Sequence, residues 1–294
     1  MTKPDFFIIG APKTGTTAMA QFLSDHPAVF MATPKEPHHY NSDHKHGGFK
    51  DPAAYAALFR DAGAKTVGEA SVFYLYSQVA VPRIEKECPN ARYIVMLRSP
   101  LEMAPALYEQ HVFSGYETSP SFEQAWELQE ARDRGTALSP PGTDVQMLYY
   151  KRICQLGDQL QRLYKHVPRE RVHIIFNNDF RAEPRRVWLE VQAFLELIDD
   201  GRYTFPVVNA AKKHKSMVVQ HFKEAALTVR HTLHIPPLQT GFFRRLETWN
   251  LQERSRTPLP GAMHKKLQTA FREDIELLGQ LTNTDLSDWL IAGD

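Results

Sequence analysis

Several features that define other classes of protein are scarce in this chain of 294 residues. Its two cysteines, Cys88 and Cys154, have no C-x-x-C spacing, which argues against a disulfide scaffold and a thiolate zinc site. No apolar run approaches the roughly 20 residues of a transmembrane helix. A net charge of +1 leaves no basic field for nucleic acid, so any anion site must be local. We therefore expect a cytoplasmic protein with no nucleic-acid partner and no transmembrane segment.

Short apolar runs alternate with longer amphipathic segments along the chain. The runs typical of strands are Phe6–Ile9, Thr66–Ala70, Tyr93–Leu97 and Val172–Phe176. The segments with helical spacing are Ala18–Leu23, Leu101–Val112, Ser121–Arg132, Gln146–His166, Pro184–Leu197 and Gly261–Gln280. This alternation predicts an α/β protein whose parallel sheet has helices on both sides. We predict one domain over residues 1–294, mainly helical from about residue 210.

The segment Gly10–Thr17 joins the first expected strand to the first expected helix. Two glycines five positions apart let backbone N–H groups and the helix N-terminus point at one anion. A nucleoside-triphosphate loop carries Lys and then Ser or Thr after the second glycine, whereas Thr16 and Thr17 stand there and Lys13 lies inside the loop. The alternative is a tight turn with a solvated lysine. The displaced lysine suits a sulfuryl group, which carries less charge than a phosphoryl group.

The same segment resembles the 5′-phosphosulfate loop, P-K-[ST]-G-T-[ST], of sulfotransferases that use 3′-phosphoadenosine 5′-phosphosulfate (PAPS). Lys35–Tyr40 resembles the K-E-P-H-[FY]-[FY] segment of the heparan-sulfate-type and bacterial branch. Further segments that resemble family patterns are Gly68–Ser71, Arg98–Ala104, Asp274–Leu278 and Trp289–Leu290. The resemblance implies a three-layer P-loop-like fold with a central parallel sheet flanked by helices. It also implies PAPS as donor and its desulfated form, PAP, as product.

The nucleotide carries two anionic ends, and the sequence offers a candidate for each. Arg98 follows an expected strand, and open α/β sheets bind ligands at the carboxyl ends of their strands. The resemblance assigns the 3′-phosphate to Arg98, but Ala106 replaces the serine that the family pattern adds. A late basic run resembles the family's closing loop, although charge runs are usually only solvated. The predicted nucleotide-binding residues are Pro12, Lys13, Thr14, Gly15, Thr16, Thr17, Arg98, Lys212, Lys213 and Lys215.

Transfer to a hydroxyl group requires a base, because the acceptor attacks poorly until it loses its proton. The resemblance makes Glu36 that base, and His38 and His39 are rival candidates. The predicted catalytic residues are Lys13, Glu36 and His38. A metal site is a weaker reading of one histidine cluster, because it lacks cysteine and a helical H-x-x-x-H pair. That cluster consists of His38, His39, His44 and His46.

Together these features predict in-line transfer of a sulfuryl group from PAPS to the hydroxyl group of a small molecule or glycan, with no metal required. A P-loop small-molecule kinase is one alternative, and it predicts binding of ATP with Mg²⁺. A non-catalytic nucleotide-binding module is another, and Ala106 is its best support. Residues between Phe113 and Tyr150 are candidates to line the acceptor pocket. The sequence does not choose among sugar, lipid and polyketide-like acceptors, although the K-E-P-H segment favours a sugar or another aliphatic hydroxyl.

Overall fold

The computed structural model describes residues 2–45, 48–137, 139–206, 212–214, 251–253 and 259–291. The chain divides into two compact units, each described here by itself. One comprises Met1–Pro206 with Leu259–Asp294, and the other comprises Val207–Pro258. The described part of the second unit is an antiparallel strand pair, β6 (Lys212–His214) with β7 (Leu251–Glu253).

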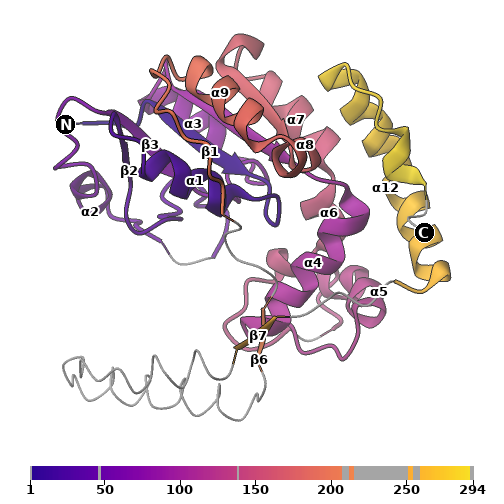
Figure 1. The fold of residues 1–294 in the computed structure, drawn as a ribbon. Helices are drawn as coiled ribbons and strands as arrows, with labels where there is room; N and C mark the ends of the chain where they lie inside the picture. Colours follow the sequence, from indigo (N-terminus) through magenta and orange to yellow (C-terminus); the bar gives the residue numbers. More distant parts are fainter. Residues whose placement is uncertain are drawn as a thin grey trace. The chain divides into compact units, whose positions relative to one another are not determined.

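The first unit contains a sheet of five parallel strands in the order β2-β3-β1-β4-β5, flanked by helices (Figure 1). The strands are β1 (Phe6–Gly10), β2 (Val29–Met31), β3 (Thr66–Ala70), β4 (Arg92–Leu97) and β5 (Val172–Phe176). Four of them confirm strands expected from the sequence, and the parallel sheet flanked by helices confirms the predicted fold class. The three-residue β2 was missed because so short a run has no measurable periodicity.

The two central strands are apolar throughout because helices cover both faces of the sheet. Phe6–Ile9 of β1 and Tyr93–Leu97 of β4 have no exposed surface. Ile8 of β1 lies opposite Ala70 of β3 on one side and Ile94 of β4 on the other. A strand buried on both faces cannot tolerate alternation of polar and apolar residues, which is why these runs were readable as strands.

Helices connect the strands and extend the unit beyond the sheet. The helices of nine residues or more are α1 (Thr16–Ser24), α4 (Pro100–Phe113), α5 (Phe122–Asp133), α7 (Leu156–Tyr164), α9 (Pro184–Phe194) and α12 (Gly261–Thr282). The shorter ones are α2 (Pro52–Ala57), α3 (Ala80–Glu87), α6 (Tyr150–Cys154), α8 (Asn177–Ala182), and the 3-10 turns Val145–Leu148, Arg169–Arg171 and Ser287–Leu290. Within the described residues, no helix combines the length and the apolar character needed to cross a bilayer.

The single helix predicted over Gln146–His166 is wrong, because this stretch forms a 3-10 turn, α6 and α7 instead. The backbone leaves the helical region at Gln155, where ψ is 78°. The Gln159 side-chain amide donates to the carbonyl groups of Arg152 and Ile153, each at 3.0 Å. The Gln159 side chain thus replaces backbone donors that a continuous helix would have offered to these carbonyl groups. The spacing of apolar residues does not reveal such a replacement.

The start of α7 is also held from outside by α12. The Asp274 carboxylate accepts the N–H groups of Gly157 at 3.0 Å and of Asp158 at 2.9 Å. Burial raises the pKa of Asp274 to about 6, although these N–H groups partly offset that effect. The two helices approach so closely that a Cβ atom on Gly157 would lie 2.4 Å from the Asp274 carbonyl oxygen. The contact therefore requires glycine.

We predict that Gly157→Ala lowers the free energy of unfolding by about 1–3 kcal/mol, the usual cost of overpacking a close contact. Urea unfolding measures this change. Gly261→Ala is the matched control, because a Cβ atom there meets nothing within 4 Å. Equal stabilities for the two variants would contradict the close contact between α7 and α12.

Candidate active site

The loop Gly10–Thr17 lies where the strand order of the sheet changes direction. From β1 the chain first builds β2 and β3 on one side and then β4 and β5 on the other. Ligands of open α/β sheets bind at such a switch point, beyond the carboxyl ends of the strands. The Ala11 N–H group donates to the Met96 carbonyl oxygen at 2.8 Å, which fixes the start of the loop to β4.

The loop turns into α1 through a left-handed residue. Gly15, the N-cap of α1, has a φ of 100°, and no side chain caps the helix. The first N–H groups of a helix have no partner within it, so this end of α1 presents donors and the positive end of the helix dipole. The Thr14 hydroxyl group donates to the Ala11 carbonyl oxygen at 2.6 Å, and it therefore braces the loop from inside.

Two cationic residues, Lys13 and Arg98, make contacts at the loop. Lys13 Nζ donates to Gln110 Oε1 on α4 at 3.2 Å. Arg98, directly after β4, donates from Nη1 to the Lys13 carbonyl oxygen at 3.2 Å and pairs with Glu102 on α4. The Arg98 guanidinium group is thus hydrogen-bonded to the backbone of the loop. Arg98 and Lys13, which are predicted to bind opposite ends of a nucleotide, are therefore in contact through the Lys13 backbone.

The Lys35–Tyr40 segment follows β2 and lies beside the end of β3. The Glu36 N–H group donates to the Ala70 carbonyl oxygen at 2.9 Å, and the His38 N–H group donates to Ser71 Oγ at 3.2 Å. Glu36 pairs with Lys35 Nζ at 2.5 Å and with His38 Nε2 at 3.3 Å. Both candidate bases therefore belong to one charged cluster.

The charged cluster keeps Glu36 ionised. Burial by itself raises the pKa of Glu36, but the hydrogen bond from His38 and the charge of Lys35 outweigh it and lower that pKa to about 2. The carboxylate is consequently deprotonated near neutral pH. It is also a weak base for as long as these contacts persist.

Positive φ angles single out the predicted catalytic residues. In the described chain, five non-glycine residues have a positive φ, and Glu196 and Asn283 among them occupy the ends of α9 and α12, where this conformation is common. The other three are Lys13 at 63°, Glu36 at 63° and His38 at 49°. Each costs roughly 1–2 kcal/mol relative to an ordinary conformation. Such strain concentrates at active sites and binding loops.

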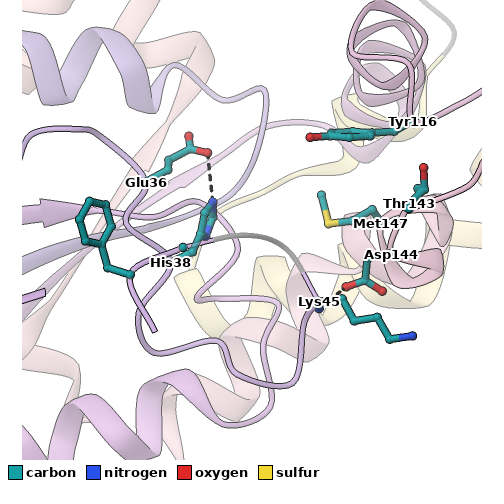
Figure 2. Close-up of a pocket in the computed structure, with 10 residues that line it drawn as sticks. Glu36, His38, Lys45, Tyr116, Thr143, Asp144 and Met147 are labelled. Carbon is teal, nitrogen blue, oxygen red and sulfur yellow. Dashed lines mark hydrogen bonds and ion pairs between the residues drawn. The ribbon is translucent and has the colours of Figure 1, made fainter. Parts of the chain in front are cut away.

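A cavity of about 420 Å³ lies beside Glu36 and His38. Figure 2 shows these two side chains on one side of it and Tyr116, Thr143 and Met147 on the other. The remaining lining residues are Lys45, Gly48, Phe49, Gly142 and Asp144. Both polar and apolar groups face the cavity, and its volume is within the usual range for small ligands.

Asp144 joins the two walls of this cavity. Its Oδ2 atom accepts the Lys45 N–H group at 2.7 Å and lies 3.7 Å from His44 Nδ1. Burial would raise the pKa of Asp144, but His44 and backbone N–H groups lower it overall. Both oxygen atoms of the buried Asp144 carboxylate accept hydrogen bonds from backbone N–H groups, which indicates a structural role in shaping the cavity.

Most of the late basic run falls outside the described residues. Lys212 and Lys213 belong to β6 in the second unit, and Lys215 lies outside the described residues. The histidine cluster is also incomplete, because His46 lies outside them. Among the residues that the structure does describe, no three His, Cys, Asp or Glu side chains are grouped as metal ligands would be.

Two residues that were not predicted from the sequence reach the site from other elements. Asn177, directly after β5, donates from Nδ2 to the Thr14 carbonyl oxygen at 2.8 Å. Its position after a strand was the available signal, since that is where parallel sheets place functional groups. Gln110, the partner of Lys13, gave no such signal because it lies inside a helix, in the last turn of α4.

The geometry of the loop agrees with a comparison of the sequence against protein families. The model of the sulfotransferase domain matches residues 3–214. The chain belongs to the sulfotransferase domain family. Membership confirms the family predicted from the loop and the K-E-P-H segment. A sulfotransferase of Alicyclobacillus acidocaldarius shares the fold, with a TM-score of 0.72 and 24% identity over 98% of this chain and 99% of that one.

Two curated sulfotransferase relatives are named for heparan sulfate. The bifunctional heparan sulfate N-deacetylase/N-sulfotransferase 3 of Mus musculus is 25% identical over 292 residues, which cover 90% of this chain and 32% of that protein. The heparan sulfate glucosamine 3-O-sulfotransferase 5 of Homo sapiens is 26% identical over 66% of this chain and 54% of that protein. The chain thus spans about a third of the length of the first of these relatives.

We predict that Asn177→Asp destabilises the sulfotransferase fold by about 1–3 kcal/mol. The change replaces the donor to a buried carbonyl group with a carboxylate that repels it. Chemical unfolding measures the effect. The neighbouring Asn178 is exposed, so Asn178→Asp introduces the same charge without this contact. If both variants lose the same stability, Asn177 does not support the loop.

Proposed function

We propose that this chain transfers a sulfuryl group in line from PAPS to a hydroxyl group of a small-molecule or glycan acceptor. One observation carries the proposal beyond family membership. The three residues expected to perform the chemistry are the described non-glycine residues that hold positive φ angles away from helix ends. Strain of this kind persists only where surrounding contacts enforce it. Here the enforcing contacts come from Ala70 and Ser71 at the end of β3 and from Arg98 directly after β4.

The 5′-phosphosulfate end of the donor fits the loop that precedes α1. The N–H groups at the uncapped helix end and the Lys13 ammonium group are suited to an anion. The proposed binding residues there are Pro12, Lys13, Thr14, Gly15, Thr16 and Thr17. We assign Lys13 the role of neutralising charge on the bridging oxygen as the leaving group departs, which requires it to exchange its contact with Gln110.

Arg98 is the proposed ligand of the 3′-phosphate. It follows β4 at the switch point, and a guanidinium group binds phosphate through two parallel hydrogen bonds. Ala106 supplies no hydroxyl group for the additional contact that the family pattern contains. Ser99, the N-cap of α4, makes no capping hydrogen bond with its side chain, so we propose its hydroxyl as the replacement. Contacts from Lys212, Lys213 and Lys215 stay a prediction.

Glu36 is the proposed base. Its carboxylate borders the cavity that is proposed to hold the acceptor. A pKa of about 2 makes Glu36 ionised but weakly basic. We propose that the acceptor hydroxyl takes the place of Lys35 beside the carboxylate, which raises the basicity of Glu36 when it is needed. His38 then holds the carboxylate in position from its other oxygen atom.

The cavity supports an acceptor of modest size with polar groups. The names of the two curated relatives described above refer to heparan sulfate. Since the cavity has an open side and mixed lining, a terminal sugar or a small hydroxylated molecule fits it. The scheme assigns no step to a metal ion. The single domain and the cytoplasmic location expected from the sequence stay predictions.

Calorimetric titration with PAP in the presence of EDTA tests the nucleotide assignment, with ATP and Mg²⁺ titrated in parallel. We expect PAP to bind without metal and ATP with Mg²⁺ to bind weakly or not at all, because the loop lacks the lysine and hydroxyl positions that serve a triphosphate. Binding of ATP with Mg²⁺ alone would overturn the proposal in favour of a kinase.

We predict that Glu36→Gln leaves the affinity for PAP unchanged and lowers turnover by at least about 10²-fold, the contribution of a positioned base. The assay follows transfer of radiolabelled sulfuryl groups from PAPS to sugar and small-alcohol acceptors. Glu170→Gln changes an exposed glutamate and serves as the control. An active Glu36→Gln beside an inactive His38→Ala would assign the base to His38 instead.

A further inference from the structure

Glu69 is a fully buried carboxylate at the end of β3 that the proposed reaction does not use. Its three hydrogen-bond partners are hydroxyl groups. Tyr55 and Tyr74 donate to Oε2 at 2.7 and 3.2 Å, and Ser71 donates to Oε1 at 2.7 Å. Burial raises the pKa of Glu69 to about 7, although the bonds from Ser71, Tyr55 and Tyr74 lower it in part.

Two of these hydroxyl groups also contact the backbone of the Lys35–Tyr40 segment. Ser71 Oγ accepts the His38 N–H group at 3.2 Å. Tyr74 Oη accepts the N–H groups of His39 at 2.9 Å and Tyr40 at 3.3 Å. Three consecutive backbone N–H groups of the segment are therefore each linked to Glu69 through a hydroxyl group, that of Ser71 or that of Tyr74.

The charge on Glu69 sets the direction of these hydrogen bonds. A hydroxyl group has one hydrogen atom, and a carboxylate can only accept. When the hydrogen atoms of Ser71 and Tyr74 point at Glu69, their oxygen lone pairs face the backbone N–H groups. A side-chain amide at position 69 would instead present its own donors to an oxygen atom that already accepts from the backbone.

We propose that Glu69 is a positioning residue, which holds the Lys35–Tyr40 segment in its strained conformation through the hydroxyl groups of Ser71 and Tyr74. The inference rests on the proposed function, because the segment contains Glu36 and His38. Tyr55 provides the internal comparison. It donates to Glu69, but within the described residues its hydroxyl group accepts no backbone N–H group of the segment.

Hydrogen exchange at single amides tests the positioning without any acceptor. At about pH 8.5, where a group with a pKa near 7 is almost fully ionised, Glu69→Gln is expected to speed exchange at His38, His39 and Tyr40 by at least about tenfold. Amides of β5 report global stability and are expected to stay unchanged. The matched control, Tyr55→Phe, keeps the ring that stacks on His39 and is expected to leave the three amides protected.

If Glu69→Gln fails to fold, two variants that each remove one of the connecting hydroxyl groups still test the proposal. Ser71→Ala is expected to speed exchange at His38 alone, and Tyr74→Phe at His39 and Tyr40. Equal acceleration at all three amides in both variants, or the same effect in Tyr55→Phe, would reduce the network to general core packing and overturn the proposal.

Kinetics separate this inference from the proposed function. We expect Glu69→Gln to lower kcat for sulfuryl transfer by about 10- to 100-fold, the scale of a small misplacement of a catalytic group, and to change the PAP dissociation constant by less than about twofold. If Glu69→Gln speeds exchange at the three amides but leaves kcat unchanged, the position of the segment does not matter for catalysis and the proposal is wrong. A wild-type protein that binds no PAP would refute the function and leave the exchange result standing.

Discussion

The parallel alignment of the strands is the constraint on which the site depends. Parallel strands end at a common edge, so the residues that follow them meet even when they are distant in sequence. The loop follows β1, Ser71 follows β3, Arg98 follows β4 and Asn177 follows β5. The bond from the Ala11 N–H group to Met96 joins the first of these segments to the sheet.

Hydrogen bonds to buried groups hold this edge in a conformation that the chain would not adopt alone. Lys13, Glu36 and His38 have positive φ angles, which are unfavourable for residues with a Cβ atom. Their backbone groups are fixed by Arg98, by the Ala70 carbonyl oxygen and by Ser71, respectively. A buried polar group that loses its partner is costly, so the surrounding core enforces the strain.

Burial decided which elements could be predicted from the sequence. The apolar runs of β1 and β4 were readable because both faces of these strands are covered. The prediction of one helix over Gln146–His166 was wrong because the side chains of Asp274 and Gln159 form hydrogen bonds with the backbone groups at the break between α6 and α7. Asn177 was missed for a similar reason, since its partner, the Thr14 carbonyl group, lies 163 positions away in the sequence.

The sequence by itself determined the parallel α/β fold and the family, because both rest on local spacing and on continuous burial, and it predicted an anion loop at Gly10–Thr17. It also named Lys13, Glu36 and His38 through motifs contained in short segments. Only the tertiary structure decided that Lys35 and His38 both contact the Glu36 carboxylate, and that a cavity borders it. The roles of Glu69 and Gln110 likewise depend on contacts between distant segments, and such contacts arise from packing that no local pattern records.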